Sequence, residues 1–435
     1  MTTASIVPSP SRTSAQFISL GLTGMFERLG RTALFARLGN LQQGMLTIID
    51  AEGEYVFGRS PAAAPLEATI TVREPQFYVD VAFGGTVGVG ESYMAGSWLV
   101  DDLTSLVRII LRNRHVLTDL ESGLAHLTAP LNRLLHGLRK NTKDGSRRNI
   151  AAHYDLGNDF YRLFLDATMT YSCAVFERPG VTLEEAQTAK YDRICQKLGL
   201  LPGHHVIEIG TGWGGFALHA AKNYGCTVTT TTISKEQFEY ARWRVQAEDM
   251  QARVQVLCKD YRDLTGTYDR LVSIEMIEAV GHQFLDTFFA KCSSLLTDEA
   301  MMALQAITII DQAYESHIRS PDFIKRYIFP GSFIPAVSAI MGVVARTTDM
   351  RLVHLEDLTA HYAMTLKIWR ERFLDRIGDV LALGYPESFI RMWDYYLGYC
   401  EGGFLERYIG DAQMVFSKPG CREDPCFPHL KADVA

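Results

Sequence analysis

The chain has 435 residues, more than one hydrophobic core usually organises, which predicts two domains. Hydrophobic residues make up 47% and charged residues 21%, a globular composition, and a formal charge of −7 does not suggest a nucleic-acid partner. The eight cysteines show neither a CxxC pair nor metal-finger spacing, so we expect reduced thiols in a cytoplasm and no metal site. We find no signal-peptide pattern and no run of roughly 18 apolar residues that would span a membrane. The sequence therefore predicts a soluble or peripherally bound protein.

The first 140 residues predict a small α+β domain. Residues 1–14 are rich in Ser, Thr and Pro, which predicts a disordered start. An apolar stripe decorated with arginines predicts an amphipathic helix over 15–39, which either packs on its own domain or lies on an anionic membrane. The further elements expected here are a β-hairpin over 44–58, strands over 68–72 and 77–83, and a helix over 103–113. We assign 15–140 to an N-terminal lipid-associated domain and 141–150 to a polar, basic linker.

From residue 151 to 435 the strand and helix signals alternate. Strands are expected at 205–210, 226–233, 253–260, 268–277 and 300–309, and helices at 216–223, 235–249 and 284–296. Strands that alternate with helices imply right-handed crossovers and a mostly parallel sheet that is covered on both faces. The sequence thus predicts an α/β, Rossmann-like domain over 151–435.

The first of these strands leads into a glycine-rich loop that reads EIGTGWGG over residues 208–215. Such a loop lets the backbone approach a ligand at the carboxyl end of the sheet, and NAD, FAD and S-adenosylmethionine all use one. A dinucleotide fold would place an acidic ribose ligand at the end of the second strand. That strand ends in the polar run TTTTIS over 229–234, without an acid, which favours S-adenosylmethionine.

Nine blocks of sequence, in one order between about residue 40 and residue 418, point to a known family. They are GESYM (90–94), HYDLGNDF (153–160), TYSC (170–173), EIGTGWGG (208–215), TISKEQ (232–237), DYRD (260–263), EAVG (278–281), YIFPG (327–331) and CEGGF (400–404). Through these blocks the chain resembles the cyclopropane-fatty-acyl-phospholipid synthases and the related mycolic acid cyclopropane synthases and methyltransferases. The resemblance implies a class I methyltransferase that uses S-adenosylmethionine to modify double bonds of unsaturated acyl chains in membrane phospholipids.

The resemblance also implies the residues of the cofactor site. It places the methionine end at Tyr171 and Ser172, the glycine loop at Glu208, Gly210, Gly212 and Trp213, the ribose at Thr232 and Gln237, and the adenine beside Asp260, Tyr261 and Arg262.

A bicarbonate ion beside the reacting methyl group is implied in the same way. The residues expected to bind it are Cys173, Glu278, Gln305, Ile307 and Tyr362. Methyl transfer to an alkene leaves a carbocation, and ring closure needs a base to take a proton from the new methyl group, which bicarbonate would do. The resemblance gives catalytic roles to Cys173, Glu278, Gln305 and Tyr362, and to Cys400, although no step of this chemistry needs a covalent nucleophile.

The chain departs from the family pattern at three positions. Gln305 stands where a histidine is usual, Ala279 where the better-known members have histidine, and Thr211 where the glycine loop has cysteine. An amide can hold an ion by hydrogen bonds but carries no charge. Two products therefore stay open: a cyclopropane, or a methyl- or methylene-branched chain without a ring. A catalytically inert lipid-binding homologue is the third interpretation, against which the retained cofactor residues argue.

An apolar segment over 327–344 predicts part of an acyl-chain tunnel, with ordinary core packing as the alternative. Its apolar members are Tyr327, Ile328, Phe329, Phe333, Ile334, Ile340 and Met341. We expect a cytoplasmic protein on the inner face of the membrane, with phospholipids as its partners. The resemblance alone suggests a homodimer.

Overall fold

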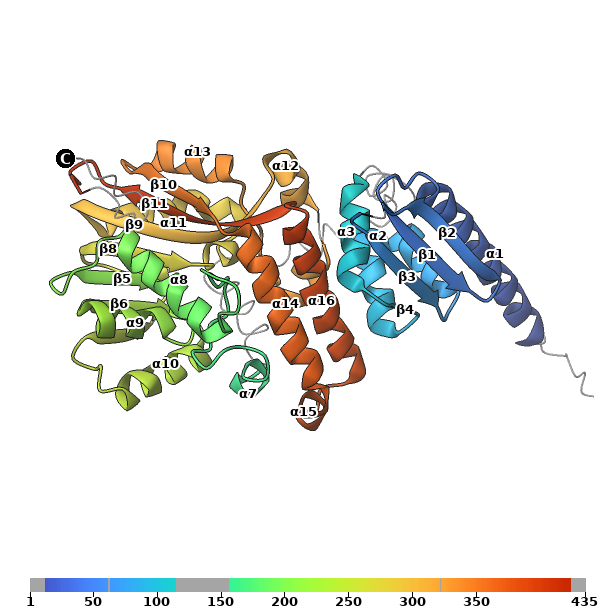
Figure 1. Cartoon of the computed structure of the whole chain (residues 1–435), viewed down its shortest axis with the longest axis horizontal. Coiled ribbons are helices and arrows are strands. Elements are labelled where there is room, and N and C mark those ends of the chain that lie inside the picture. Colours follow the sequence, from blue (N-terminus) through green and yellow to red (C-terminus); the bar gives the residue numbers. More distant parts are fainter. Residues whose placement is uncertain (1–11, 62, 115–155, 321, 424–435) are drawn as a thin grey trace, which may run out of the picture. The chain divides into compact units, whose positions relative to one another are not determined.

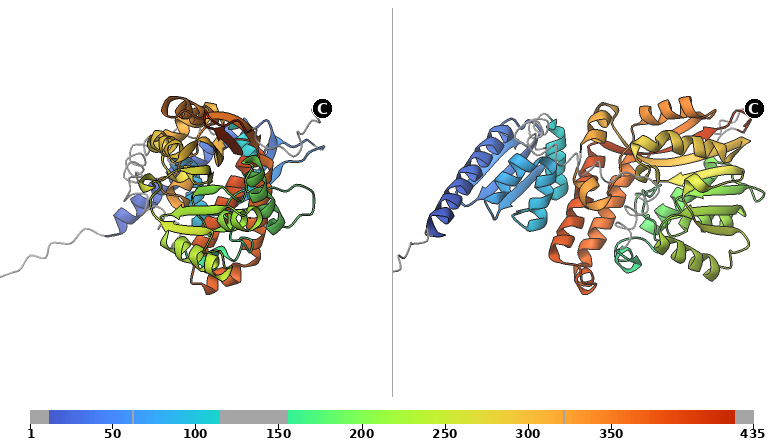
Figure 2. Two further views of the ribbon diagram at one scale, coloured as in Figure 1. Left: turned by 90° about the vertical axis from the view of Figure 1, so that its left-hand side faces the viewer. Right: turned by 180° about the vertical axis from the view of Figure 1, so that it is seen from behind.

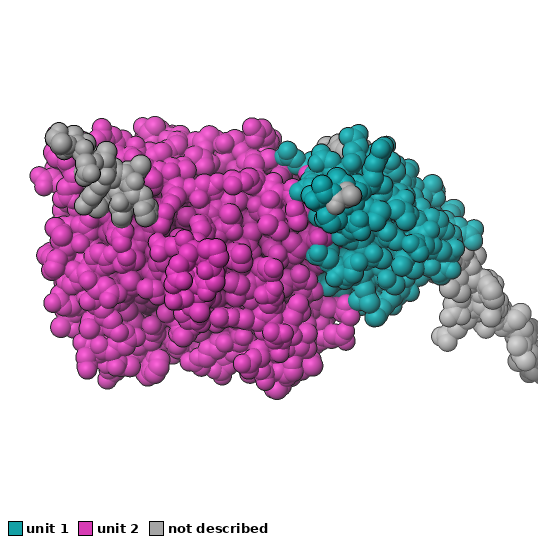
Figure 3. Space-filling model, in the orientation of Figure 1, with its two compact units in different colours: residues 1–102, 112–129 teal, residues 103–111, 130–435 magenta. Residues whose placement is uncertain are grey.

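The structure is a computed structural model that describes residues 12–61, 63–114, 156–320 and 322–423. These residues form two compact units, whose described parts are 12–102 with 112–114 (unit 1) and 103–111 with 156–423 (unit 2; Figure 3). The first helix begins at Arg12, three residues before its predicted start, and the linker predicted over 141–150 lies outside the described residues. Within these described ranges, no helix has both the length and the apolar character to cross a membrane.

Unit 1 is a four-stranded sheet with helices, as Figure 1 shows. Its elements are α1 (Arg12–Leu38), β1 (Gly44–Asp50), β2 (Gly53–Arg59), β3 (Glu67–Val72), α2 (Gln76–Ala95) and β4 (Trp98–Val100), with the strand order β2-β1-β3-β4. The predicted hairpin is present, because β1 and β2 pair antiparallel from Gly44 opposite Arg59 to Asp50 opposite Gly53.

The strand predicted over 77–83 is wrong, because these residues belong to helix α2. The buried side chains of Phe77, Tyr78, Val81 and Ala82 recur with helical spacing, which a short apolar window does not distinguish from a buried strand. Gly85, with φ 56° and ψ −144°, interrupts the helix within the glycine-rich stretch that follows.

Unit 2 contains one large sheet. Its elements are α3 (Leu103–Arg112, of which 103–111 lie in this unit), α7 (Asn158–Tyr161), α8 (Leu183–Lys197), β5 (His205–Ile209), α9 (Gly215–Tyr224), β6 (Thr227–Thr232), α10 (Lys235–Ala247), β7 (Val254–Cys258), η2 (Tyr261–Asp263), β8 (Tyr268–Ile274), η3 (Ile277–Ala279), η4 (His282–Phe284), α11 (Leu285–Ser294), β9 (Leu296–Ile309), α12 (Asp311–Arg319), η5 (Ile324–Ile328), α13 (Val337–Thr347), β10 (Arg351–Asp357), α14 (Thr359–Asp375), α15 (Ile377–Ala382), α16 (Glu387–Leu405) and β11 (Ile409–Ser417). The strand order is β10-β11-β9-β8-β5-β6-β7, in which β7, β6, β5, β8 and β9 run parallel and β11 and β10 pair antiparallel. The predicted α/β fold with a mostly parallel sheet is confirmed.

Both faces of this sheet are covered, as the views in Figures 1 and 2 show. Neighbouring residues of one strand belong to different core clusters: Val206 packs with helices α8 and α9, whereas Ile207 packs with α11 and α13. Successive side chains of a strand point to opposite faces, so two apolar clusters on one strand mean two buried faces. Strand β5 therefore has buried apolar side chains on both of its faces.

Helix α3 was expected within the N-terminal domain, but its residues 103–111 pack on α16 in unit 2. The Thr104 hydroxyl donates to Glu401 at 2.9 Å, and Arg108 pairs with Glu406 at 2.8 Å. At Gly402 an added Cβ would lie 2.7 Å from Cγ1 of Val107 and 3.2 Å from the carbonyl oxygen of Thr104. Gly402 of the CEGGF block thus allows α16 and α3 to approach closely.

We predict that Gly402→Ala destabilises unit 2 by about 1–3 kcal/mol, because its methyl group overpacks the contact with Val107. Gly378→Ala is the matched control, since it is also a helical glycine but has no atom within 4 Å of its added Cβ. Thermal denaturation should show a lower midpoint for Gly402→Ala and an unchanged or slightly higher one for Gly378→Ala. Equal midpoints for the two variants would contradict the packing described.

Candidate active site

A cavity of about 330 Å³ lies where the parallel strands of unit 2 end. Gly210 follows β5, Thr232 ends β6 and Glu275 follows β8, and all three line the cavity. The carboxyl ends of parallel strands are where open α/β sheets bind ligands, because the loops there leave a crevice between neighbouring strands.

The predicted cofactor residues form part of the cavity lining. All eleven line it: Tyr171, Ser172, Glu208, Gly210, Gly212, Trp213, Thr232, Gln237, Asp260, Tyr261 and Arg262. They come from four separate stretches of chain, which only the parallel sheet brings together.

The glycine loop needs its glycines for conformation as well as for space. Gly210 and Gly212 have φ of 105° and 51°, a region in which side chains other than glycine are strained. A Cβ at Gly210 would also meet the side chain of Met276 at 3.0 Å. Beside them, the indole N–H of Trp213 donates to Oδ1 of Asn158 at 2.7 Å, which fixes the ring in the cavity wall.

Three further contacts prepare polar groups for a ligand. The Thr232 hydroxyl donates to Oε1 of Gln237 at 2.9 Å, and Oδ1 of Asp260 accepts the backbone N–H of Arg262 at 2.9 Å. Glu208 accepts from the hydroxyl of Thr230 at 2.6 Å, and burial raises its pKa to about 8. A cationic ligand would favour the ionised form of Glu208, so the cavity suits a ligand with a positively charged amino group and a sulfonium.

The residues expected to hold bicarbonate converge, but on a side chain of the protein itself. Oε1 of Glu275 accepts from the backbone N–H of Cys173 at 2.8 Å and from the amide of Gln305 at 2.7 Å. Oε2 of Glu275 accepts from the hydroxyl of Tyr362 at 2.6 Å. Three donors of the expected ion cage are therefore already bound to one carboxylate.

Glu278 is the other carboxylate of this region, and it is held differently. Its Oε1 accepts the backbone N–H of Ile307 at 2.6 Å, whereas its buried Oε2 has no hydrogen-bond partner. Burial, and then the neighbouring Glu275, raise the pKa of Glu278 to about 8. Burial also raises the pKa of Glu275, against the lowering effects of Tyr362, Cys173 and Lys190.

Bicarbonate does not fit this arrangement. A second anion beside Glu275 would face the carboxylates of Glu275 and Glu278 without the donors that the cage was expected to supply. The expectation of a bicarbonate site at Cys173, Glu278, Gln305, Ile307 and Tyr362 is therefore replaced by a site that carries its own carboxylate.

The two cysteines expected to be catalytic have unreactive surroundings. The Cys173 thiol is fully buried and donates to the carbonyl oxygen of Ala174, and only its backbone N–H reaches Glu275. Cys400 lines the cavity. Burial raises the pKa of both thiols, which keeps them protonated and poorly nucleophilic. No group of His, Cys, Asp and Glu in the described ranges could hold a metal ion.

The cavity is also lined by apolar and aromatic residues. Of the predicted tunnel residues, Phe329, Phe333 and Ile334 line it, whereas Ile340 and Met341 pack in the core with α11. Tyr362, Tyr396 and Phe404 add to the aromatic lining beside Tyr171 of the cofactor set, and Val107 and Leu111 of α3 contribute aliphatic surface. Such a lining suits an alkyl chain, because it offers apolar contact next to a few oriented polar groups.

Sequence reasoning missed Glu275, although a signal was present. Glu275 lies near the end of the fourth predicted strand, 268–277, and Glu278 follows it, and acids at that edge of a parallel sheet face the ligand crevice. Its φ of 47° is unusual for a residue other than glycine and cannot be read from the sequence. Lys190, which donates to the Ser172 hydroxyl at 2.6 Å, was missed because buried lysines are rare.

The fold and the cavity together define a class I S-adenosylmethionine-dependent methyltransferase. The sequence pattern of the mycolic acid cyclopropane synthetase family matches residues 141–414. The chain is 39% identical over 378 residues to a tuberculostearic acid methyltransferase of Mycobacterium tuberculosis, which covers 82% of this chain and 85% of that protein. It is 38% identical over 356 residues to the cyclopropane-fatty-acyl-phospholipid synthase of Escherichia coli, with 81% and 88% covered.

Among solved structures, a mycolic acid cyclopropane synthase complexed with S-adenosylhomocysteine and CTAB superimposes with a TM-score of 0.59. It is 33% identical and covers 62% of this chain and 98% of its own. The protein belongs to the mycolic acid cyclopropane synthetase family and is an S-adenosylmethionine-dependent C-methyltransferase of the cyclopropane synthase type.

We predict that Glu278→Gln raises the stability of the ligand-free protein, and that the gain grows as the pH rises from about 5 to about 8. The pKa of Glu278 is about 8 when folded, above its ordinary value of 4.5, so the folded state binds more protons than the unfolded state in this window. Stability therefore falls with rising pH in the native protein, and glutamine removes this cost. Thermal midpoints across the window measure it, with Glu371→Gln as the control because its side chain is 62% exposed. A constant difference between Glu278→Gln and the native protein would contradict the assignment.

Proposed function

We propose that the protein transfers the methyl group of S-adenosylmethionine to a double-bond carbon of an unsaturated acyl chain in a membrane phospholipid and closes a cyclopropane ring. The carrying observation is that one cavity is lined by the eleven predicted cofactor residues, by further apolar and aromatic residues, and by Glu275. The acyl substrate is supported by the apolar wall, and the phospholipid by the relative named for that substrate in Escherichia coli. We also assign unit 1 the role of a lipid-associated domain.

The aromatic wall has a chemical task in this reaction. S-adenosylmethionine supplies an electrophilic methyl group when it is bound. An isolated alkene is a weak nucleophile, and after the new carbon–carbon bond forms the other alkene carbon carries a positive charge. Tyr171 lies with its ring centroid 5.2 Å from that of Trp369 and 6.3 Å from that of Phe329, and aromatic faces stabilise such a cation. The apolar surroundings also keep water from capturing it.

Glu275 supplies the base. Ring closure removes one proton from the transferred methyl group, and the electron pair of that C–H bond forms the last ring bond. The proton goes to the carboxylate of Glu275, which the Cys173 N–H, Gln305 and Tyr362 hold in one orientation. Buried Lys190 and the arriving sulfonium both favour the ionised form of Glu275 that this step requires.

A branched product is the second candidate, and the hydrogen bonds on Glu275 favour it. A carboxylate that accepts from three donors is a weaker base than a free one, because each donor stabilises its charge. A slower proton transfer gives a hydride time to shift between the two former alkene carbons. Loss of a methyl proton then leaves a methylene branch without a ring. The relative from Mycobacterium tuberculosis is named for tuberculostearic acid, not for a cyclopropane.

The experiment that tests this function is incubation of the purified protein with S-adenosylmethionine and vesicles of monounsaturated phospholipid. We expect each modified chain to gain the mass of one CH₂ group, and proton NMR to show cyclopropane hydrogens and no olefin. The same mass gain with an olefin would establish the methylene branch instead. No mass gain, with cofactor binding demonstrated by calorimetry, would contradict the proposed function.

Two substitutions of Glu275 separate its roles. Glu275→Gln keeps the shape but removes the base, so we expect turnover to fall by about 10²-fold or more with little change in S-adenosylhomocysteine affinity. Glu275→Gly also removes the base, but it suits the φ of 47° and leaves space among the three donors.

Added bicarbonate or formate should therefore restore turnover to Glu275→Gly and not to Glu275→Gln. Steady-state rates with and without the added anion measure this rescue. Full activity of Glu275→Gln would show that another group takes the proton.

A further inference from the structure

A row of polar residues crosses the sheet of unit 2 from its edge to the active site. In the strand register, Glu356 on β10 is paired with Gln413 on β11, and Gln413 is paired with Gln305 on β9. The backbone N–H of Glu275 donates to the carbonyl oxygen of Gln305 at 2.8 Å, which continues the row to β8. Such a row of directly paired residues lies on one face of a sheet, with its side chains within contact distance.

These side chains form a continuous chain of hydrogen bonds that begins at Lys197 on α8. Nζ of Lys197 donates to Oε1 of Gln413 at 2.6 Å. Nε2 of Gln413 donates to Oε1 of Gln305 at 3.0 Å, and Nε2 of Gln305 donates to Oε1 of Glu275 at 2.7 Å. Lys197, Gln413 and Gln305 are 4%, 2% and 1% exposed, so water cannot easily replace these partners.

The direction of this chain follows from its first member. An ammonium group only donates hydrogen bonds, whereas a glutamine side chain has an accepting end and a donating end. Lys197 therefore requires the oxygen of Gln413, which turns the Gln413 nitrogen toward Gln305 and the Gln305 nitrogen toward Glu275. Without that requirement both amides could turn over together, and Gln305 would then present its oxygen to the carboxylate.

We propose that Lys197 is a positioning residue, which fixes the direction of the Lys197–Gln413–Gln305 relay so that Gln305 always presents its N–H to Glu275. This role rests on the proposed function of Glu275 as the base, because a donor from Gln305 holds the carboxylate in place and keeps it ionised. It extends the active site from the cavity to the far edge of the sheet.

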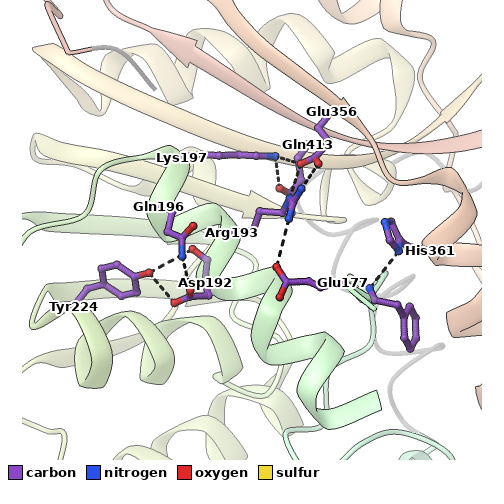
Figure 4. Close-up of polar contacts among 10 residues, drawn as sticks. Glu177, Asp192, Arg193, Gln196, Lys197, Tyr224, Glu356, His361 and Gln413 are labelled. Carbon is purple, nitrogen blue, oxygen red and sulfur yellow. Dashed lines mark hydrogen bonds and ion pairs between the residues drawn. The ribbon is translucent and has the colours of Figure 1, made fainter. Parts of the chain in front are cut away.

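The surroundings of Lys197 support this role. Figure 4 shows Lys197 reaching toward Glu356 and Gln413, with Arg193 on the same carboxylate of Glu356. Nζ of Lys197 lies 2.6 Å from Oε2 of Glu356, and a guanidinium nitrogen of Arg193 lies 2.5 Å from Oε1 of Glu356. Burial lowers the pKa of Lys197 to about 8, and the hydrogen bond with Glu356 opposes this effect and favours the charged, donating form.

The titratable groups around Glu275 are the background against which a change in the relay is measured. They are Lys190 on α8, Cys173, Tyr362 on α14, Asp411 on β11 and Glu278 after β8. None of them is a member of the relay, so breaking the relay leaves these neighbours in place and removes only the Gln305 donor at Oε1, where the Cys173 N–H remains.

The test compares two breaks of the relay with one matched control. Lys197→Met removes the charged donor, and Gln413→Met removes the first amide while the ion pair of Lys197 with Glu356 stays. Arg193→Met is the control, because it removes a cation from the same Glu356, while the partners of Arg193 are Glu356 and Glu177 and neither relay amide. Infrared difference titration against Glu275→Gln follows the protonated carboxyl band of Glu275 and needs no turnover.

We expect Lys197→Met and Gln413→Met each to make the carboxyl group of Glu275 at least about tenfold easier to protonate, a shift of about one pH unit. Arg193→Met should stay within about threefold of the native protein. An unchanged titration in both relay variants, or an equal shift in Arg193→Met, would overturn the proposal. Circular dichroism checks that each variant is folded. If one relay variant does not fold, the other can still be compared with Arg193→Met.

The pH dependence of kcat separates this proposal from the proposed function. If Glu275 is the base, the acid limb of the profile moves by the same amount as the infrared titration in the two relay variants. A shifted titration with an unmoved kcat profile would keep the relay and refute the assignment of Glu275 as the base.

Discussion

The carboxylate of Glu275 is the group on which the rest of the active site depends. It lies directly after strand β8, with a backbone conformation that glycine would adopt more readily, and it accepts from Cys173, Gln305 and Tyr362. These donors come from a loop, from strand β9 and from helix α14, so one carboxylate ties three parts of unit 2 together. A non-glycine residue with positive φ costs free energy, which the three hydrogen bonds offset.

The sheet explains how so polar a centre is held inside an apolar domain. The buried polar side chains have partners on the neighbouring strands. Gln305 is paired with Gln413, and Gln413 is paired with Glu356, which accepts hydrogen bonds from Lys197 and Arg193. A buried polar group is tolerated when its hydrogen bonds are made within the protein. The antiparallel strands β11 and β10 are thus more than an extension of the sheet, because they supply the polar row behind the carboxylate of Glu275.

Much of this architecture could be predicted from the sequence because it depends on local patterns. The five parallel strands alternate with helical segments and the glycine loop follows the first of them, so the arrangement could be expected, and all eleven predicted cofactor residues line the cavity. Residues 77–83 of helix α2 were mistaken for a strand, because a window of seven residues is too short to distinguish a buried helix from a buried strand.

The ion site could not be predicted in the same way. The family resemblance supplied the cage residues, but what fills the cage depends on how Glu275 turns its side chain back toward Cys173 and Tyr362. That direction follows from a positive φ and from partners more than 80 residues away in the sequence, which no local pattern encodes. The assignment of residues 103–111 of α3 to unit 2 could not be predicted for the same reason. It depends on the contact of Thr104 with Glu401, which lies 297 residues away in the sequence.

The measurement that tests this account most directly is the turnover rate of the native protein in buffer freed of carbon dioxide, compared with the rate after bicarbonate is added back. Because Glu275 already occupies the donors of the expected ion site, the account predicts the same rate in both conditions. A rate that falls on removal of bicarbonate and recovers on its return would contradict the central claim that the enzyme carries its own base.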